Sequence, residues 1–443
     1  MKIALVDLKF GDKKANRDHT GGFGSFMQAS GVIGGLVSRM KANLIELPVM
    51  SLGFATSILE QAGHTVTFTQ GADLAGQDIV IIANSMHCYA DELVWARRQR
   101  KLMPEAKIGF YGPFVYEQQA LFKNDADFMI GGELESALFA FLDSEIELTG
   151  PINRGVVKDL TRLPFPDWRA MDHKKFNYFP LLHKRPFFPV QSTRGCTFNC
   201  DFCPYMVSQT KAFRRRDPVH VVDEIERNVR DFGMRSMLFR DICFTLNKKH
   251  ARTISELLIE RNLKVEWACE TRIDCLDESL IDVMVEAGLR GVNLGIETGA
   301  NDILLASGKK NPAVALQERI VGYLHEKGVR INGFYMLGLT GDTEESMEDT
   351  IEYAKHLNTL GAQFCITTPF PGTDLYESVK GSLLTTDFTQ FTEYRPVVNI
   401  ETSTPDQVRK AHGRAYRDYY LRPSWLLAKA PTTIVRLIAN SLS

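Results

Sequence analysis

The chain has 443 residues, which is long for a single domain and favours two or three domains. Hydrophobic residues make up 44% of it and charged residues 24%, a balance typical of a globular protein. The formal net charge of −2 argues against a nucleic-acid partner and favours a small organic substrate.

Residues 1–155 alternate short apolar segments with amphipathic helical segments, a pattern typical of βαβ units around a parallel sheet. The expected strands cover residues 3–8, 65–69, 79–83, 107–111 and 128–130. The expected helices cover residues 52–62, 90–101 and 135–142. This order predicts an α/β, doubly wound, Rossmann-like domain.

Doubly wound sheets bind ligands beyond the carboxyl ends of their strands. The polar residues and glycines expected there are Asn84, Ser85, Gly112, Gly131, Gly132 and Glu133. The Gly-rich segment 18–26, here called the glycine loop, is a candidate cover for a cofactor or part of a substrate pocket. His19 and His87 lie in loops near the same crevice, where binding and structural roles are both open. His64, at a helix end, is more typical of a turn.

Residues 156–184 are interrupted by prolines and predict an extended linker. From 185 to 380, six strands are expected at residues 187–193, 236–239, 265–270, 291–294, 330–337 and 362–367. Helices are expected between them at residues 219–232, 248–261, 278–287, 313–327 and 343–360. Six βα units predict a partial (β/α)6 barrel whose active mouth lies at the carboxyl ends of its strands.

Three cysteines, Cys196, Cys200 and Cys203, fall within one short turn, residues 192–205, here called the cysteine loop. A structural zinc site needs four closed ligands, and no second cysteine or histidine pair follows at a suitable spacing. Three thiolates suit a four-iron, four-sulfur (4Fe-4S) cluster that keeps one iron open for a small molecule. The alternative is three ordinary core cysteines.

With Phe202 directly before its last cysteine, the cysteine loop resembles the cluster loop of the radical S-adenosylmethionine (radical SAM) superfamily. The resemblance implies that the three cysteines are catalytic and hold the metal cluster, whose open iron chelates S-adenosylmethionine. One electron then cleaves that molecule to a 5′-deoxyadenosyl radical. The residues that the resemblance places around S-adenosylmethionine are Arg272 at the carboxylate, Glu297 at the ribose or amino group, and Phe202, Tyr205 and Asp241 near the adenosyl part. For Arg272 the alternative is an ion pair with Asp274 or Glu270.

The first domain resembles the cobalamin-binding domain that precedes many radical SAM cores. The residues that carry this resemblance are Pro48, Gly53, Gly63, Val66, Gly112, Pro113, Asp127, Phe128, Gly131, Gly132 and Glu133. The resemblance implies cobalamin as a cofactor. The Asp-x-His-x-x-Gly motif, which supplies a histidine to cobalt in some of these domains, is absent after the first strand, so cobalamin would be bound without that histidine.

Residues 381–443 predict a mainly helical segment with a helix at 406–420. Residues 417–423 resemble the tail of radical SAM proteins related to the anaerobic magnesium-protoporphyrin ester cyclase. Such a segment would shape the substrate pocket or simply cap the barrel. The apolar tail 424–438 either contacts a membrane surface peripherally or packs on the barrel.

No apolar run reaches 18 residues, so no transmembrane helix is expected. The chain starts without a signal peptide and its eight cysteines are scattered, which predicts a cytoplasmic protein.

The leading functional hypothesis is cobalamin-dependent C-methylation of an unactivated carbon in a small-molecule or lipid-like substrate. The electron donor would be a protein such as flavodoxin or ferredoxin, and Cys243 is a candidate hydrogen-atom donor.

Two alternatives remain open at this level. One is radical cyclisation, rearrangement, dehydration or deoxygenation without cobalamin. The other is a non-catalytic iron–sulfur electron carrier, which would have no use for Arg272, Glu297 and the motifs at the strand ends.

Overall fold

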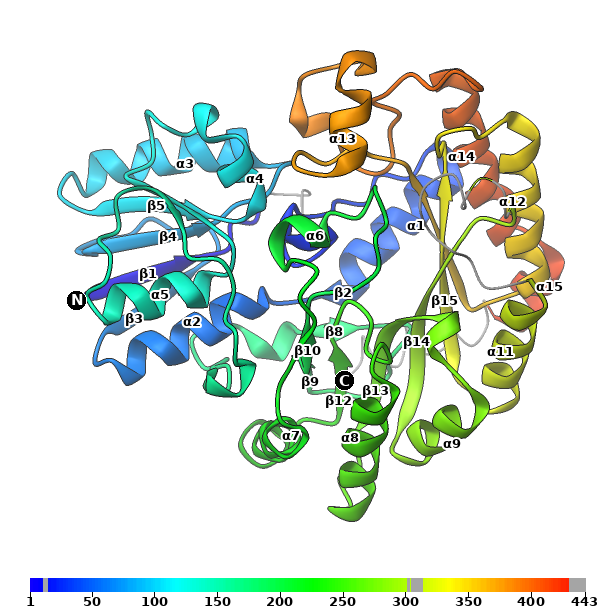
Figure 1. The fold of residues 1–443 in the computed structure, drawn as a ribbon, viewed down its shortest axis with the longest axis horizontal. Coiled ribbons are helices and arrows are strands. Elements are labelled where there is room, and N and C mark those ends of the chain that lie inside the picture. Colours follow the sequence, from blue (N-terminus) through cyan, green and yellow to red (C-terminus); the bar gives the residue numbers. More distant parts are fainter. Residues whose placement is uncertain (11–14, 301–302, 304–313, 430–443) are drawn as a thin grey trace.

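The computed structural model describes residues 1–10, 15–300, 303 and 314–429. Two six-stranded parallel sheets form the frame of the molecule. The N-terminal sheet, blue to cyan in Figure 1, lies beside a second, strongly curved sheet that runs from green to yellow. Of the C-terminal helices, α14 (Pro405–Tyr420) and α15 (Pro423–Ala428), orange-red to red, lie on the far side of the second sheet, whereas α13 (Asp374–Val379), orange, lies at the top of the view, nearer the N-terminal sheet.

The N-terminal sheet has the strand order β3-β1-β4-β5-β6-β7, with every neighbouring pair parallel. Its strands are β1 (Lys2–Val6), β3 (Thr65–Thr69), β4 (Ile79–Ala83), β5 (Lys107–Tyr111), β6 (Phe128–Gly131) and β7 (Gly150–Asn153). Its covering helices are α2 (Met50–Gln61), α3 (Tyr89–Leu102), α4 (Pro113–Glu117) and α5 (Leu134–Leu142).

The two faces of this sheet belong to different cores because side chains alternate along a strand. On β1, Ile3 and Leu5 pack into the large core that includes α2 and α5. Ala4 and Val6 face the smaller core that includes α3. Strands buried on both faces read as continuous apolar runs, which is why β1 and β4 are visible in the sequence.

Strand β7 and helices α1 (Gly31–Leu44) and α4 are among the elements of this half that were not predicted. Strand β7 starts with Gly150 and Pro151, which give no strand pattern. Helix α1 contains three glycines, which disfavour helices, so no helix was expected there. Gly34 is required by close packing, since a Cβ atom at this position would lie 2.9 Å from Ala29.

The second sheet has the order β16-β15-β14-β13-β12-β9, again entirely parallel. Its strands are β9 (Phe187–Val190), β12 (Ser236–Phe239), β13 (Glu266–Arg272), β14 (Leu289–Glu297), β15 (Arg330–Leu337) and β16 (Gly361–Ile366). Its outer helices are α7 (Pro218–Phe232), α8 (Lys248–Glu260), α9 (Glu278–Glu286), α11 (Val314–Glu326) and α12 (Glu344–Leu357). These are the six strands of the expected open barrel.

Local sequence signals set the ends of these helices. Helix α7 begins where the Asp217 carboxylate accepts a hydrogen bond from the Val219 backbone, with Pro218 in the first turn, and it ends at Gly233 in the left-handed conformation. Helix α12 begins with a capping box between Thr343 and Ser346.

Helices cover the convex face of the second sheet, whereas the concave face is less completely covered by other elements. On β15, Ile331, Tyr335 and Leu337 are buried, whereas the alternate residues Asn332 and Phe334 remain half-buried. The lumen of the barrel is therefore lined by the alternate residues of neighbouring strands.

The remaining elements join the two sheets. Helix α14 (Pro405–Tyr420) packs on α1, α12 and β16, and α15 (Pro423–Ala428) follows it. The predicted linker 156–184 is closely packed: Trp168 is buried against Gly53, where a Cβ atom would lie 2.7 Å from the indole ring.

The shorter elements are β2 (Ile45–Glu46), β8 (Asn177–Tyr178), β10 (Thr193–Arg194), β11 (Arg214–Arg215), α6 (Tyr205–Ser208), α13 (Asp374–Val379), η1 (Thr20–Gly22), η2 (Gln119–Leu121), η3 (Leu160–Arg162), η4 (His173–Lys175), η5 (Ile273–Cys275), η6 (Lys380–Ser382) and η7 (Phe388–Gln390).

The start of the apolar tail 424–438, for which membrane contact and packing on the barrel were both open, packs on the barrel, because the Trp425 indole donates a hydrogen bond to the Leu360 carbonyl at 2.9 Å. Residues 430–443, the rest of that tail, lie outside the described residues. In the described part of the chain, no helix combines the length and apolarity needed to cross a membrane.

Candidate functional site

The cysteine loop leaves β9 and reaches the carboxyl end of the second sheet. Gly195 has a φ of +80°, and a Cβ atom there would lie 2.2 Å from the Ala212 carbonyl oxygen, so only glycine fits. Cys196 is buried, while Cys200 and Cys203 are half-buried. The Cys203 backbone N–H donates to the Cys200 carbonyl at 3.1 Å, which closes a turn between these two cysteines.

This donor set suits an iron–sulfur cluster rather than a single ion. Within residues 1–10, 15–300, 303 and 314–429, no three Cys, His, Asp or Glu side chains converge enough to hold one metal ion. A four-iron cluster does not need such convergence, because each cysteine binds a different iron. Three thiols on one loop, two of them partly accessible, match that requirement.

Arg272 stands at the end of β13 beside the cysteine loop. Its guanidinium lies 3.8 Å from the centroid of the Phe198 ring and forms an ion pair with Asp274 at 2.7 Å. Burial lowers the pKa of Arg272, but the Asp274 hydrogen bond and charge, together with Cys200, raise it overall. The ion pair with Asp274, which was the alternative role of Arg272, is therefore formed. The same guanidinium also lies close to Cys200.

Glu297 and Asp241 differ in where they are placed. Glu297 ends β14 with a φ of +69°, an uncommon conformation for a non-glycine residue, and it pairs with Tyr335 of β15 beyond a break in the strand register. The Asp241 carboxylate is fully buried and accepts hydrogen bonds from the Ser192 backbone at 2.7 Å and the Thr193 hydroxyl at 2.8 Å. Asp241 thus fixes the start of the cysteine loop instead of facing the lumen.

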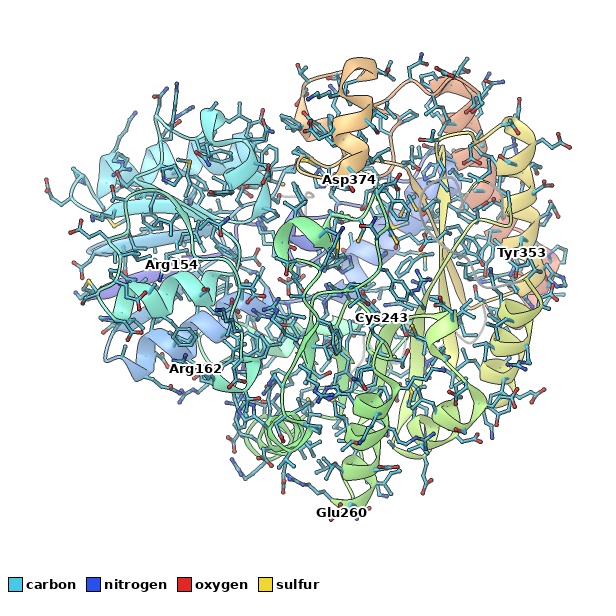
Figure 2. All side chains as sticks on the ribbon, in the orientation of Figure 1. Arg154, Arg162, Cys243, Glu260, Tyr353 and Asp374 are labelled. Carbon is cyan, nitrogen blue, oxygen red and sulfur yellow. The ribbon has the colours of Figure 1, made fainter. Side chains whose placement is uncertain are left out.

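Cys243 lies just beyond β12, near the carboxyl ends of the barrel strands (Figure 2). Its thiol is 3.5 Å from the Thr271 hydroxyl. A hydrogen bond with Cys275 is the main cause that lowers the pKa of Cys243 to about 7, and it raises the pKa of Cys275. The sequence singled out Cys243 without showing that Cys275 is its neighbour.

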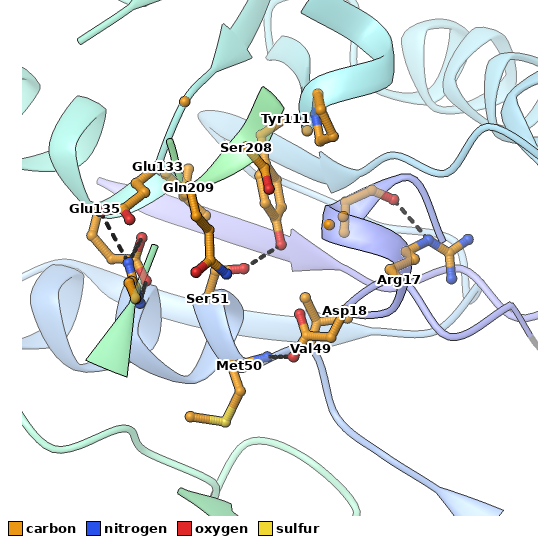
Figure 3. Close-up of a pocket in the computed structure, with 18 of the residues that line it drawn as sticks. Arg17, Asp18, Val49, Met50, Ser51, Tyr111, Glu133, Glu135, Ser208 and Gln209 are labelled. Atoms are coloured by element: carbon orange, nitrogen blue, oxygen red, sulfur yellow. Dashed lines mark hydrogen bonds and ion pairs between the residues drawn. The ribbon is translucent and has the colours of Figure 1, made fainter. Parts of the chain in front are cut away.

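A cavity of about 760 Å³, open to solvent, lies between the N-terminal sheet and the cysteine loop (Figure 3). Four residues predicted from the strand ends line it: Asn84, Gly112, Gly132 and Glu133. Asp18 from the glycine loop and Arg194 from the cysteine loop also line it, together with residues that the sequence did not indicate, among them Arg17, Ser51, Tyr111 and Gln209. Tyr205, from the cysteine loop, completes one side.

Ser85 and Gly131 do not line this cavity. The Ser85 backbone N–H is turned to Glu92, at 3.1 Å, and the residue is fully buried. Gly131 is needed for packing, because a Cβ atom there would lie 2.4 Å from the Tyr116 ring. Phe202 belongs to the half-buried part of the cysteine loop and also lies outside the cavity lining.

The wall of the cavity holds a buried ionic network on the N-terminal side. Arg17 donates to Asp7 at 2.7 Å and to Glu92 at 2.9 Å, and the Asn84 amide donates to Glu92 at 2.6 Å. The Asn84 side-chain oxygen is buried and has no hydrogen-bond partner. Ser51 and Tyr111 share a hydrogen bond of 2.6 Å at the cavity surface, as Figure 3 shows. A polar ligand with donor groups would satisfy this wall.

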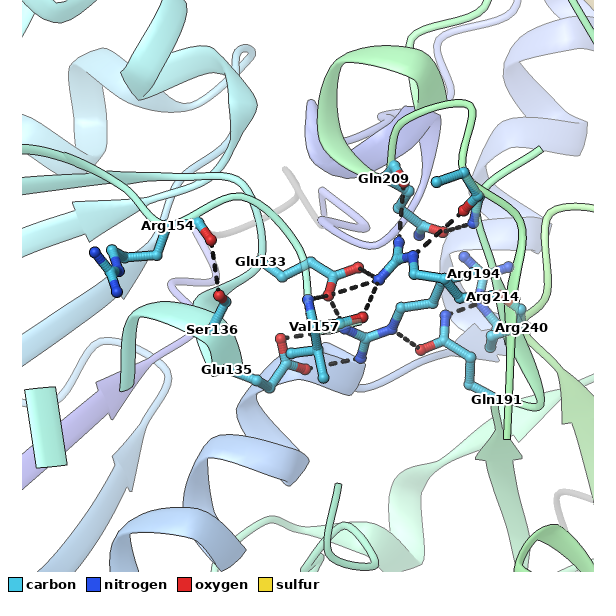
Figure 4. Close-up of polar contacts among 12 residues, drawn as sticks. Glu133, Glu135, Ser136, Arg154, Val157, Gln191, Arg194, Gln209, Arg214 and Arg240 are labelled. Atoms are coloured by element: carbon cyan, nitrogen blue, oxygen red, sulfur yellow. Dashed lines mark hydrogen bonds and ion pairs between the residues drawn. The ribbon is translucent and has the colours of Figure 1, made fainter. Parts of the chain in front are cut away.

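A second network joins the two sheets across the cavity (Figure 4). The Arg194 guanidinium pairs with Glu135 at 2.8 Å and with Glu133 at 3.1 Å. Arg214 pairs with Glu133 at 2.9 Å and donates to the Val157 carbonyl at 2.7 Å. Since Arg194 lies two residues before Cys196, this network ties the cysteine loop to the N-terminal sheet.

The glycine loop lies against the cysteine loop. Gly21 has a φ of +61°, and a Cβ atom there would lie 2.7 Å from the Pro204 carbonyl, so the two loops meet backbone to backbone. Phe23 does not fill the cavity, because it is fully buried against Phe370, with ring centroids 5.3 Å apart. Met27 lines a different cavity, inside the barrel.

The two loop histidines differ in their contacts. His87 Nε2 is 2.9 Å from the Gly24 carbonyl, and burial lowers the pKa of His87 to about 4. His19 is held neutral, because burial lowers its pKa well below the usual value, and its Nε2 is buried without a partner. His64 contacts the amino terminus of the chain at 3.3 Å, a structural position.

Glu393 was not indicated by the sequence, yet it joins the glycine loop to the C-terminal segment. Its carboxylate accepts hydrogen bonds from the Ser25 hydroxyl at 3.0 Å and the Thr20 hydroxyl at 3.4 Å. Thr20 and Glu393 have φ values of +55° and +62°, so both sides of this contact are strained. Burial raises the pKa of Glu393 to about 7.

This raised pKa predicts a pH-dependent gain in stability for Glu393→Gln. Between pH 4.5, the ordinary pKa of a glutamate side chain, and about pH 7, the folded state keeps a proton that the unfolded state has released, so the free energy of unfolding falls as the pH rises. We expect Glu393→Gln to raise the free energy of unfolding at pH 8 by about 3 kcal/mol. The gain should vanish below pH 4.5. Urea unfolding at both pH values measures it, and the exposed Glu377→Gln is the control; an equal gain at both pH values contradicts the burial of an ionised carboxylate.

Comparison with known proteins follows the same division of the chain. Residues 190–354 match the sequence profile of the radical SAM superfamily. An uncharacterised methyltransferase of Pyrococcus horikoshii is 31% identical over 62% of this chain and 59% of its own length. The anaerobic magnesium-protoporphyrin IX monomethyl ester cyclase of Rubrivivax gelatinosus is 30% identical over 61% of this chain and 48% of its own length. The chain thus spans about half to three fifths of these curated relatives.

Among solved structures, the radical SAM methyltransferase TsrM from Kitasatospora setae, with cobalamin and a 4Fe-4S cluster bound, has a TM-score of 0.62. The match covers 85% of this chain and 77% of that chain at 16% identity. At this identity the likeness is one of fold. It confirms the predicted fold class, a Rossmann-like parallel sheet followed by a partial barrel and a helical C-terminal segment.

Proposed function

Through residues 190–354 this chain belongs to the radical SAM superfamily, and on that premise we propose that it is a cobalamin-dependent methyltransferase that methylates an unactivated carbon of a small organic substrate. When bound, the 4Fe-4S cluster supplies the electron that cleaves S-adenosylmethionine to the radical that abstracts a substrate hydrogen, and cobalamin supplies the methyl group. The observation that carries the proposal is the cavity between the two sheets. One of its walls contains Gly112 and Gly132 at the strand ends, and another contains Tyr205 from the cysteine loop.

The chain's own residues have separate tasks in this proposal. Cys196, Cys200 and Cys203 hold the cluster. Arg272 pairs with the carboxylate of S-adenosylmethionine, and Glu297 accepts hydrogen bonds from its ribose or amino group. Arg272 is the last residue of β13 and Glu297 the last residue of the neighbouring β14, so both lie at the carboxyl ends of barrel strands.

The cavity between the sheets would hold cobalamin. Its glycines allow a large ring system to lie close to the backbone, and the buried Asn84 oxygen provides an unused acceptor. Gly21 and Gly22 of the glycine loop also line this cavity. Among the residues that the structure describes, the lining of this cavity contains no histidine.

A second candidate function is a radical cyclisation or rearrangement without cobalamin. The ion pairs of Arg194 and Arg214 with Glu133 favour it, because they already join the two walls and occupy part of the space between them. In that case the N-terminal sheet would serve as a module for the substrate.

Anaerobic reconstitution with iron, sulfide and hydroxocobalamin distinguishes the two functions. We expect about four irons and one corrin per chain. Iron without corrin would support the second candidate function.

Filling the cavity should separate corrin binding from cluster binding. Ser51→Phe places a ring at the cavity surface and should lower the bound corrin by about tenfold or more, since displaced ligand contacts are lost outright, while the iron content stays the same. The matched control is Ser279→Phe on the exposed side of α9, which should leave both contents unchanged. An unchanged corrin content in Ser51→Phe would place cobalamin elsewhere.

A further inference from the structure

A second cavity opens inside the barrel, about 920 Å³ in volume and partly open to solvent. Its apolar wall comes from α1 and the segment before it, the segment after β8 and the start of α15, with Met27, Val37, Met40, Leu44, Phe179, Leu181 and Trp425. Its polar wall comes from the concave face of the barrel, with Asn293, Asn332 and Gln363. Nothing in the proposed cluster or cobalamin sites uses this space.

The polar wall is built in register across the strands. Glu270 on β13, Asn293 on β14 and Asn332 on β15 are direct neighbours. The Asn332 amide donates to the Asn293 oxygen at 3.2 Å, and the Asn293 amide donates to the Tyr178 hydroxyl at 2.7 Å. These side chains hold each other in place, so the wall is preformed.

Lys41 brings a positive charge into this cavity from α1. Its ammonium donates a hydrogen bond to the Gln363 side-chain oxygen, which is a neutral partner. No ion pair among the described residues includes Lys41, and burial lowers its pKa. A buried cation without an anionic partner is costly, so the position favours an anionic ligand.

The nearby carboxylates are engaged elsewhere. Glu270 forms an ion pair with Arg240 at 2.6 Å. Glu393 accepts its hydrogen bonds from Ser25 and Thr20, and burial raises its pKa to about 7. Cys365, which also faces Lys41, keeps its proton because burial raises its pKa to about 12. The neutral His19 lies on the same side.

We propose that this barrel cavity is the substrate site and that it takes an elongated apolar organic acid, whose carboxylate pairs with Lys41 while its apolar body lies against α1 and Trp425. That the bound acid is a substrate rests on the proposed function. That the cavity binds such an acid does not. A carboxylate fits better than a phosphate ester, because the cavity offers one cation and neutral amides, without the arginine fork that phosphates favour.

Binding of ten-carbon probes to the full-length, cluster-reconstituted protein tests the proposal at pH 7.5. Decanoate, decanol and decylamine have similar apolar bodies and differ in charge. Titration calorimetry, together with the fluorescence of Trp425, gives the affinities, and Trp425→Phe identifies the optical signal. We expect decanoate to bind about 10- to 100-fold more tightly than decanol or decylamine.

Variants of Lys41 make the assignment specific. Lys41→Met should weaken decanoate about 10- to 100-fold and leave decanol unchanged, and Lys41→Arg should keep most of the decanoate affinity. Lys355→Met, which removes a half-buried lysine on α12 that is paired with Glu352, should change nothing. Should Lys41→Met not fold, the three-probe comparison on the unmodified protein still decides.

Equal affinity for the three probes, or decanoate binding that does not depend on Lys41, overturns the proposal. Corrin content and S-adenosylmethionine cleavage are measured on the same preparation. Lys41-dependent decanoate binding without corrin would reject the proposed methyltransferase and keep the acid site. Bound corrin and S-adenosylmethionine cleavage without a preference for decanoate would support the proposed methyltransferase and reject the acid site.

Discussion

Cys200→Ala should abolish the reductive cleavage of S-adenosylmethionine, a loss of at least about 1,000-fold to the uncatalysed background. The reason is that two thiols cannot hold a cluster whose three ligands come from one loop. The half-buried Cys200 lies near Arg272, so the loss would occur next to the proposed carboxylate site. Iron and sulfide quantitation, with detection of 5′-deoxyadenosine by mass spectrometry, measures both effects on one sample.

The matched control is Cys88→Ala, which removes a buried thiol at the start of α3, outside the cysteine loop. It should keep the iron content and cleavage activity of the unmodified protein. Full cleavage activity in Cys200→Ala would remove the basis for the proposed radical chemistry.

Arg194→Met should lower the free energy of unfolding by about 3–5 kcal/mol, because it leaves the buried carboxylates Glu133 and Glu135 without this shared partner. The side chains of Arg194 and Glu135 are 5% and 1% exposed, so water cannot compensate for the loss. Urea unfolding of the reconstituted protein measures the change. Cluster retention should fall with it, since Arg194 precedes Cys196 by two residues.

Two further variants test that cause. Arg98→Met breaks an exposed pair with Asp73 and should cost less than about 1 kcal/mol. Adding Glu135→Gln to Arg194→Met should recover part of the loss, because the uncompensated charge is then removed. If the double variant is as unstable as the sum of the two single ones, Arg194 and Glu135 are not coupled.

The strands and helices were predictable where their signal is local. The apolar runs of β4 and β5 and the amphipathic pattern of α7 give bounds within one residue of those observed. Strand β7 and helix α1 were missed because proline and glycine hide their pattern. Tertiary packing stabilises both elements, and packing between distant segments cannot be read from a window of neighbouring residues.

The candidate site was predictable to the extent that it lies on one segment. The spacing of Cys196, Cys200 and Cys203 identified the cysteine loop directly. Lys41 and Glu393 carried no motif, because their importance comes from burial and from neighbours on remote segments. Asp241 was found by its motif, but only the structure shows that its carboxylate holds Ser192 and Thr193.

The contact between the glycine loop and Glu393 has a consequence for biosynthesis. The Ser25 hydroxyl donates to a carboxylate 368 residues further along the chain, and the Ser30 backbone donates to His412, 382 residues further along. At ordinary rates of translation these partners leave the ribosome on the order of tens of seconds after the loop does. The N-terminal sheet can therefore assemble while synthesis continues, whereas the loop that joins it to the barrel must wait until Glu393 and His412 have been synthesised.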